Sequence, residues 1–527
     1  MTSGPDIEIF VPEQMNLTSY FLEDNISKGR GNKVAIYYKD EKYTFNDISR
    51  LTNKVGNVLN ELGVRLEDRV LLVLQDSPEW VVSWYGIMKI GGVSTHAYTY
   101  LQPGGYEDFV NLIRPKVIVV DDTTLDRVRE GVSRTRHSPA LLVAGQPPLT
   151  LGAREYNFHD MIKSASDHLE AEPMSSDDIA FWLFSGGTTG KPKAVPHMHR
   201  DGIIGCESWQ YIVHYTEDDI VLNVPKMFFH YAHILGMNFP LRAGAAVVLF
   251  PERTTAPLIF ELVEKHKPTI LVNVPTMMRA MLQTPEAERR DLSSIRLCYS
   301  AGEALSAQLY NDWRRTFGIK ILDNIGSAEA YMAYFARYPD EEVPLGSVGR
   351  VTPGVEVKIV DNEGNEVARG ETGVLWVQTD AAGYYYVREH EKSKRTFLGN
   401  DWINTNDLFR EDEQCFFWYC GRADDMVKIS GVFVSPLEIE TCIQTHPAVK
   451  ECVVLGLTDA DGLTKNKAFV ALKAGFEPSE KMADELKTYC KEKLASYKSP
   501  KVIEFMSELP KTGYDKIDKR QLQERGL

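Results

Sequence analysis

Residues 184–193, FSGGTTGKPK, combine glycines, hydroxyl side chains and lysines in a way that could hold a phosphate-sized anion. Backbone amides of a glycine-rich loop and a nearby ammonium group are suitable donors for such an anion. The Walker-type loop of ATPases requires glycine, four residues, then glycine, lysine and a hydroxyl residue. Here Ser185 stands at the first glycine position and Pro192 at the hydroxyl position, so the segment is not a Walker loop. A phosphate-binding loop and a flexible linker both fit this composition.

Two further segments with acidic or hydroxyl side chains directly follow predicted strands. They are SAGEAL at 300–305 and NIGSAEA at 324–330. In sheets of parallel strands, ligands bind beyond the carboxyl ends of the strands. We therefore expect both segments to border a ligand.

The elements that position these segments alternate between short apolar runs and longer segments of helical period. This alternation predicts parallel sheets covered by helices. The runs expected to be strands are 70–75, 117–120, 245–250, 269–273, 295–300 and 319–324. Helices are expected at PEWVVSWYGIMKI and APLIFELVEKH. From about residue 345 shorter strands separated by turns indicate a β-rich subdomain, and a change of texture near 421–425 indicates a domain boundary.

Length and composition limit the classes of protein to which the chain could belong. A chain of 527 residues is long enough for two or more domains, and its net charge of −15 disfavours a basic face for nucleic acid or anionic membranes. Its seven scattered cysteines disfavour a disulfide framework. The chain start lacks the apolar run of a signal peptide, and no stretch of about 18 apolar residues occurs. We expect a soluble, cytoplasmic protein.

Five signals in fixed order carry a resemblance to a known family. FSGGTTGKPKA, NIGSAE, NTND, GRADDMVKISGVFVSPLEIE and LPKTGYDKIDKR resemble the motifs of the adenylate-forming superfamily of acyl-CoA synthetases, luciferases and adenylation domains. SAGEAL and DNIGSAE look most like the benzoate and medium-chain acyl-CoA ligases. The resemblance implies an α/β fold. A large N-terminal domain, 1–423, would hold two helix-covered parallel-type sheets and the β-rich subdomain, and a small α+β domain, 424–527, would follow on a hinge.

The family's chemistry explains the glycine-rich loop. A carboxylate attacks the α-phosphorus of ATP, pyrophosphate leaves, and the thiol of coenzyme A opens the acyl-adenylate. Because the first two reactants are anions, the protein must neutralise charge and align them. The resemblance implies that the loop holds the β- and γ-phosphates. The residues implied to bind ATP are Ser185, Gly186, Gly187, Thr188, Thr189, Gly190, Lys193, Gly302, Glu303, Ala304, Asp323, Asn324, Ile325, Gly326, Ser327, Asp407 and Arg422.

The resemblance also implies how metal and ribose are held. Glu329 would bind Mg²⁺ through one carboxylate, with Thr188 beside it, as Mg²⁺ typically takes one or two protein carboxylates. An acid at the start of a helix is the structural alternative for Glu329. Asp407 resembles the aspartate that accepts hydrogen bonds from both ribose hydroxyls, and Arg422 resembles the arginine next to it.

Lys516 resembles the family's catalytic lysine, which stabilises negative charge as carboxylate and phosphate meet. A surface lysine in a basic tail is the alternative. Asp424 lies at the family's hinge position. Rotation there would withdraw Lys516 and bring in the segment that binds coenzyme A, made up of Lys428, Ser430 and Gly431.

The acyl pocket is implied to form from 228–236, SAGEAL and 325–334. His230 lies where many relatives carry a gating residue, although a structural role is the alternative for any of these histidines. The implied lining residues are Tyr231, Ala232, His233, Ala301, Ile325, Gly326, Met332 and Ala333. They indicate a compact apolar pocket that would suit an aromatic or alicyclic ring.

The sequence thus predicts an AMP-forming carboxylate–CoA ligase that uses ATP, Mg²⁺ and coenzyme A on a small cyclic or medium-sized acid. A ligase that loads an acyl carrier protein is an alternative. So is a nucleotide-binding relative without turnover, because Ala194 and Asp515 stand where the family usually has glycine. A monomer and a homodimer are both compatible with the sequence.

Overall fold

The computed structural model describes most of the chain as two compact units. The described residues are 1–146, 148, 150–186, 192–303, 305–429, 432–458, 464–511 and 517–526, with no side chain described for 186, 428–429, 432–433 and 497. One unit comprises Met1–Val357 and Val377–Asn404, and the other comprises Lys358–Trp376 and Thr405–Leu527. The predicted boundary after residue 423 is not one of these divisions and stays a prediction.

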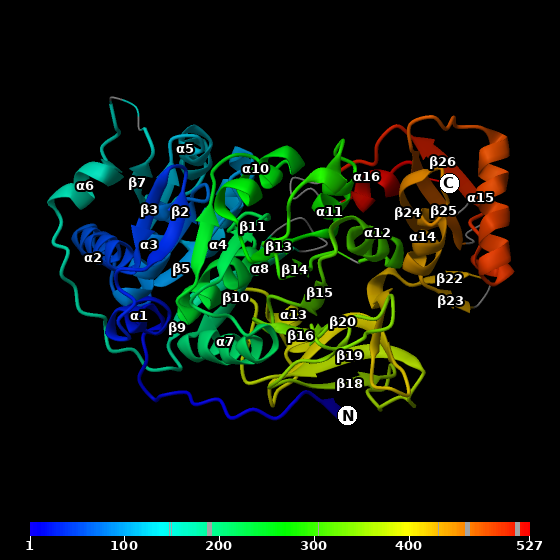
Figure 1. Ribbon diagram of the computed structural model, residues 1–527, viewed down its shortest axis with the longest axis horizontal. Helices are drawn as coiled ribbons and strands as arrows, with labels where there is room; N and C mark the ends of the chain where they lie inside the picture. Colours follow the sequence, from blue (N-terminus) through cyan, green and yellow to red (C-terminus); the bar gives the residue numbers. More distant parts are fainter. Residues whose placement is uncertain are drawn as a thin grey trace. The chain divides into compact units, whose positions relative to one another are not determined.

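The first unit contains a seven-stranded sheet, coloured blue to green in Figure 1. In spatial order its strands are β10 (Pro192–Met198), β9 (Ile179–Gly186), β5 (Val93–His96), β4 (Arg69–Val73), β6 (Val117–Asp121), β7 (Ala140–Ala144) and β8 (Glu155–Asn157). All neighbours pair in parallel except β9 and β10. Its accompanying helices are α2 (Phe45–Glu61), α3 (Pro78–Lys89), α4 (Pro103–Ile113), α5 (Leu125–Ser133), α6 (Phe158–Ser164) and α7 (His199–Val213). The start of α3 is fixed by Ser77, whose side chain accepts the Trp80 amide.

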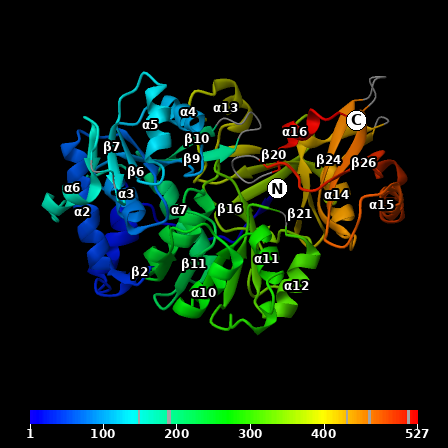
Figure 2. The same cartoon turned by 90° about the horizontal axis from the view of Figure 1, so that it is seen from above.

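The second sheet of this unit has nine strands. In spatial order they are β17 (Arg350–Val351), β16 (Ala333–Ala336), β15 (Ile321–Gly326), β14 (Leu297–Ser300), β13 (Ile270–Asn273), β11 (Ile220–Asn223), β12 (Ala246–Leu249), β2 (Val34–Tyr38) and β3 (Glu41–Thr44). Figure 2 shows α10 (Ala256–His266), α11 (Pro275–Leu282) and α12 (Ala307–Phe317) along one side of it. These helices and the central strands share one buried apolar cluster, which supplies the hydrophobic stabilisation of this layer.

Shorter elements complete the first unit. They are η1 (Ser19–Glu23), α1 (Asp24–Ser27), α8 (His230–His233), η2 (Ile234–Asn238), α9 (Phe239–Ala243), η3 (Ala287–Arg289) and α13 (His390–Thr396). A π-helical turn, η2, follows α8 directly. Such turns are frequent at functional sites.

A five-stranded sheet contains most strands of the predicted β-rich region. Its order is β1 (Thr2–Ser3), β18 (Glu356–Val360), β19 (Thr372–Gln378), β20 (Trp402–Glu411) and β21 (Phe417–Arg422). Towards the C-terminus, orange to red in Figure 1, the remaining elements are η4 (Ala423–Asp425), β22 (Val427–Ile429), β23 (Val432–Val434), α14 (Pro436–Gln444), β24 (Val449–Thr458), β25 (Thr464–Leu472), α15 (Glu480–Lys493), η5 (Ser496–Lys498), β26 (Val502–Met506) and α16 (Lys519–Gln523). Here α14 and α15 share an apolar core with β24 and β25.

The predicted fold class is confirmed. Each of the six predicted strands overlaps an observed one, and the segment APLIFELVEKH forms α10. All seven cysteines are free thiols. Within the described ranges, no helix has both the length and the apolar character needed to cross a bilayer.

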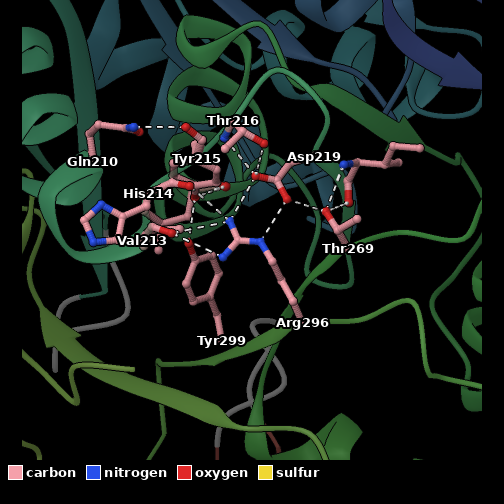
Figure 3. Close-up of polar contacts among 11 residues, drawn as sticks. Gln210, Val213, His214, Tyr215, Thr216, Asp219, Thr269, Arg296 and Tyr299 are labelled. Carbon is pink, nitrogen blue, oxygen red and sulfur yellow. Dashed lines mark hydrogen bonds and ion pairs between the residues drawn. The ribbon is translucent and has the colours of Figure 1, made fainter. Parts of the chain in front are cut away.

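A polar network joins the amino ends of three strands in the nine-stranded sheet. Asp219, Thr269 and Arg296 directly precede β11, β13 and β14 and point toward one another (Figure 3). Arg296 donates Nε and Nη2 to Oδ1 and Oδ2 of Asp219, at 2.9 Å each, and the Thr269 hydroxyl donates to Oδ1 at 2.6 Å. Burial raises the pKa of Asp219, but these donors outweigh burial, and the pKa is lowered. The ionised carboxylate therefore stabilises this edge of the sheet.

Candidate functional site

The opposite, carboxyl edge of the same sheet holds polar side chains of a different kind. Asn273, Ser300 and Asp323 lie side by side on β13, β14 and β15. Asn324 donates its side-chain amide to the Ser300 carbonyl at 3.0 Å. Oδ1 of Asp323 is buried and has no hydrogen-bond partner among the described residues. Burial raises the pKa of Asp323 to about 7, so this carboxyl takes up a proton far more readily than an exposed one.

The SAGEAL segment turns away from β14 at this edge. Gly302 has a φ of +81°, a conformation that favours glycine, and an added side chain there would meet open space. Glu303 is exposed. The Thr276 hydroxyl donates to its carboxylate and lies 2.8 Å from Oε1 and 2.7 Å from Oε2. Ala301 is buried. The predicted site residue Ala304 lies outside the described residues.

The flanks of the glycine-rich segment pair with each other as antiparallel strands. Ser185 on β9 lies opposite Lys193 on β10, and Gly186 lies opposite Pro192. Oγ of Ser185 is buried and has no partner in the described part of the chain. The pairing puts Ser185 and Lys193 at the same register position of the two strands, which is compatible with the phosphate hypothesis. The other predicted loop residues, Gly187, Thr188, Thr189 and Gly190, lie outside the described ranges.

Glu329 lies in the turn between β15 and β16, not at the start of a helix. Tyr386 donates its hydroxyl to Oε1 of Glu329 at 2.6 Å, and the Gly383 amide donates to the Glu329 carbonyl at 2.7 Å. Burial raises the pKa of Glu329, but the hydrogen bonds, Tyr386 foremost, and the charge of Lys193 outweigh burial and lower the pKa. The result is an ionised, partly buried carboxylate next to a lysine.

His197 supports the same turn from β10. Its Nδ1 lies 2.8 Å from Oδ2 of Asp201, and its Nε2 lies 2.7 Å from the Ala328 carbonyl oxygen. The carbonyl can only accept, so Nε2–H donates to it. Sequence reasoning missed both His197 and Tyr386. The runs HMH and GYYY were visible, but neither run indicates which residue it contacts.

The predicted acyl segment forms α8. Tyr231 donates its hydroxyl to the Asn273 carbonyl at 3.1 Å, which ties α8 to the carboxyl edge of the sheet. His230, half-buried, begins the helix, and Ala232 is buried.

His233 is packed into the core. Its Nδ1 donates to the Met227 carbonyl at 3.0 Å, and its ring lies 4.8 Å from Trp84 and 5.0 Å from His96, measured between centroids. Burial lowers the pKa of His233 well below its usual value, so the imidazole is neutral. These contacts are those of a structural histidine.

The end of β15 lies very close to its antiparallel neighbour β16. Gly326 lies opposite Ala333 at an irregularity in the strand pairing. A Cβ atom on Gly326 would lie 2.4 Å from the Met332 carbonyl oxygen and 2.7 Å from Cα of Ala333. Ile325 and Ser327, on either side, are half-buried. Only glycine allows this approach of the two backbones.

In the second unit, Asp407 and Arg422 face each other across β20 and β21. Nη1 of Arg422 donates to Oδ1 of Asp407 at 3.0 Å. Burial lowers the pKa of Arg422, but the charge of Asp407 outweighs it and raises the pKa. The backbone turns just before Asp407, where Asn406 has a φ of +57°. The predicted ribose pair is thus a preformed ion pair.

The other predicted residues of this unit are only partly described. Asp424 is exposed in η4, and the neighbouring Asp425 forms an ion pair with Lys519 at 2.5 Å. Lys428 lies on β22, paired with Phe433. Ser430, Gly431 and Lys516 lie outside the described residues.

Comparison with known proteins assigns the family. The family model described as AMP-binding enzyme matches residues 22–386, and that of the AMP-binding enzyme C-terminal domain matches residues 438–516. The chain belongs to the AMP-binding enzyme family. The resemblance seen in its motifs is therefore confirmed. The predicted boundary after residue 423 lies between the two matched regions and stays a prediction.

This AMP-binding enzyme has similar relatives over nearly its whole length. It is 34% identical over 518 residues to the benzoate–CoA ligase of Thauera aromatica, covering 98% of this chain and 97% of that one. It is 33% identical over 512 residues to the 4-hydroxybenzoate–CoA/benzoate–CoA ligase of Rhodopseudomonas palustris, covering 96% and 93%. The crystal structure of the anthranilate CoA ligase AuaEII in complex with anthranoyl-AMP matches with a TM-score of 0.91 and 36% identity, covering 98% of each chain. The chain is an AMP-forming acid–CoA ligase, which uses ATP and coenzyme A.

Proposed function

We propose that this enzyme activates an aromatic carboxylic acid as its adenylate and transfers the acyl group to coenzyme A. One observation carries the proposal. The two relatives and the solved structure compared above cover nearly the whole chain at 33–36% identity, and their names specify benzoate, hydroxybenzoate or anthranilate.

The residues around α8 support a ring-shaped acid. Tyr231 is bonded to the sheet edge, and Gly326 and Ala333 are small residues that lie opposite each other where β15 pairs with β16. Buried Met332 adds an adaptable apolar wall. A compact apolar pocket formed by these residues would suit a flat or alicyclic ring better than a flexible chain. His230, at the start of α8, is proposed as the gate to this pocket.

The proposed first step is attack of the acid on the α-phosphorus of ATP. Ser185 and Lys193 hold the departing pyrophosphate by hydrogen bond and charge. Asp407 accepts hydrogen bonds from the ribose hydroxyls, and its ion pair with Arg422 at 3.0 Å keeps the carboxylate ionised and oriented. Lys516 stabilises the negative charge that gathers as the two anions meet. Gly302, Glu303, Asp323 and Asn324 border the adenine.

Glu329 fits a magnesium ion. Its carboxylate is ionised and partly buried, and Mg²⁺ favours one or two such oxygen ligands together with phosphate oxygens and water. Bound Mg²⁺ supplies neutralisation of the phosphate charge. Thr188 is the proposed hydroxyl partner.

The proposed second step uses the same nucleotide-binding residues after a rotation at Asp424, the boundary of the proposed domains 1–423 and 424–527. The rotation replaces Lys516 by the segment with Lys428, Ser430 and Gly431, which binds the pantetheine arm. The coenzyme A thiolate then attacks the acyl carbonyl, and AMP leaves.

Mass spectrometry of products tests the proposal. The protein is incubated with ATP, Mg²⁺ and benzoate, hydroxybenzoates, aminobenzoates, cyclohexanecarboxylate, octanoate or acetate, each with and without coenzyme A. The proposal expects acyl-CoA and AMP, with the highest kcat/KM for an aromatic acid. A preference for octanoate or acetate contradicts the substrate class. Acyl-AMP that persists after coenzyme A is added indicates a carrier-protein acceptor, and the absence of AMP with every acid contradicts catalysis.

A further inference from the structure

The backbone around Glu329 is held by contacts separate from those that hold its side chain. His197 donates to the Ala328 carbonyl at 2.7 Å, and the Gly383 amide donates to the Glu329 carbonyl at 2.7 Å. Both contacts fix the path of the turn between β15 and β16. Neither sets the direction of the carboxylate, which depends on rotation about the side-chain bonds.

Tyr386 contacts the carboxylate itself. Its hydroxyl oxygen lies 2.6 Å from Oε1 of Glu329, a short distance that is typical of a hydrogen bond to a charged acceptor. The tyrosine is itself buried, and its backbone amide donates to Oγ of Ser393 in α13 at 2.9 Å. Because the phenol is rigid and its backbone is anchored, it can hold the carboxylate in one orientation.

The same ring also contacts the predicted phosphate-binding lysine. Nζ of Lys193 lies 4.8 Å from the centroid of the Tyr386 ring, within the range of a cation–π interaction. One side chain thus contacts both the anionic and the cationic group that the proposed function assigns to the nucleotide. Its hydroxyl donates a hydrogen bond to the carboxylate, and its ring face contacts the ammonium group of the lysine.

We propose that Tyr386 is a positioning residue that orients the Glu329 carboxylate for the divalent cation of bound ATP and, through its ring, places Lys193 for the phosphates. This rests on the proposed roles of Glu329 and Lys193. Tyr386 does not itself touch the reacting atoms.

Two substitutions separate the two contacts. Tyr386→Phe removes the hydroxyl and keeps the ring, whereas Tyr386→Leu removes both. Tyr384→Phe and Tyr385→Phe are matched controls, because these neighbouring tyrosines are 49% and 44% exposed. The measurement is calorimetric titration of Mg²⁺ into full-length enzyme saturated with a non-hydrolysable ATP analogue. Titrations of metal-free ATP and of AMP, and the melting temperature, accompany it.

For Tyr386→Phe we expect about tenfold weaker Mg²⁺ binding, the usual effect of losing a partner that orients a metal ligand. AMP affinity should stay unchanged, and the melting temperature should fall by no more than a few degrees. Tyr386→Leu should in addition weaken metal-free ATP binding about threefold, as expected for loss of a cation–π contact. Both controls should bind Mg²⁺ as the unaltered enzyme does.

Unchanged Mg²⁺ binding in Tyr386→Phe overturns the proposal. Equal weakening of Mg²⁺ and AMP binding with a lower melting temperature also overturns it, because Tyr386 would then serve only the fold. None of these titrations needs an acid or coenzyme A. Failure of the proposed substrate class therefore appears in the product assay alone and is distinguishable from failure of this inference.

Discussion

Asp219 and Asp323 lie near opposite ends of strands in the same nine-stranded sheet, and their surroundings differ. Asp219, at the amino edge, accepts hydrogen bonds from Arg296 and Thr269, and its pKa is lowered. Asp323, at the carboxyl edge, is buried with one oxygen lacking a partner among the described residues, and its pKa is raised to about 7.

The difference indicates that the two edges of one sheet have different roles. Polar groups at the amino edge are paired within the protein, so they stabilise the fold and have little capacity left for a ligand. At the carboxyl edge, partners are incomplete, which costs folding free energy and leaves donors and acceptors for a substrate. We therefore expect substitutions at the amino edge to affect stability and those at the carboxyl edge to affect activity.

The largest effect is expected from Lys516, and it sets the scale for the comparison. Lys516→Ala should slow adenylate formation by about 10³-fold, because the charge that we propose to stabilise the transition state is lost. Formation of acyl-CoA from supplied acyl-AMP should remain nearly unchanged. Single-turnover assays of each half-reaction measure both rates. Equal loss in the two half-reactions contradicts the role of Lys516.

Glu329→Gln should reduce adenylate formation by about a hundredfold while changing the melting temperature by no more than a few degrees. The substitution keeps the shape of the side chain but removes the charge proposed to bind the metal. Glu264→Gln, at a surface pair with Arg290, is the matched control. If Glu329→Gln left activity normal but lowered the melting temperature strongly, Glu329 would have a structural role only. The proposed difference between the two edges of the sheet would then be wrong.

Arg296→Met should instead lower stability and leave activity nearly unchanged. It leaves the buried carboxylate of Asp219 with fewer hydrogen-bond donors, which should lower the free energy of unfolding by about 2 kcal/mol. The loss is not larger because the Arg296 side chain is 41% exposed and solvent screens its charge. Thermal and urea unfolding measure the change, and kcat/KM should stay within about twofold. A large loss of activity at unchanged stability would show that the amino edge takes part in function.

The smallest effect concerns pH. Between pH 6 and 8 the Asp323 carboxyl of the folded protein loses its proton, whereas in the unfolded chain it is already ionised at pH 6. Because the folded state binds more protons than the unfolded state in this range, stability falls as pH rises. With a native pKa of about 7, this decline is about 1 kcal/mol. Asp323→Asn should remove that part of the decline, as measured by urea midpoints at both pH values.

Asp219→Asn should lower stability equally at pH 6 and 8, because the lowered pKa keeps Asp219 ionised throughout. A pH-dependent decline that Asp323→Asn leaves intact would assign the slope to another group.

Elements with strong periodicity could be predicted from the sequence. The predicted helix APLIFELVEKH has the bounds of α10, because its apolar residues recur on one face and Pro257 favours its first turn. The predicted strands 269–273 and 295–300 begin later in the structure, at Ile270 and Leu297. Thr269 and Arg296 look like strand residues by position, but their side chains belong to the network around Asp219.

The candidate site could be predicted as a set of motifs but not as a set of contacts. The resemblance to the family singled out Glu329, Lys193, Asp407 and Arg422 as candidates, and their roles stay predictions. Tyr386 is 57 residues from Glu329 in sequence, and no periodicity links them, so only the fold brings the two together. The packing of His233 against aromatic rings was unpredictable for the same reason.

The close pairing of strands at Gly326 restricts how the proposed acid pocket can change. Any side chain there would have to separate β15 from β16, since even a methyl group would meet backbone atoms at 2.4 and 2.7 Å. A mutational search for new substrates should therefore recover almost no variants at Gly326. Altered preference should arise at Met332 and Ala333, where side chains can be exchanged while the pairing of β15 with β16 is kept.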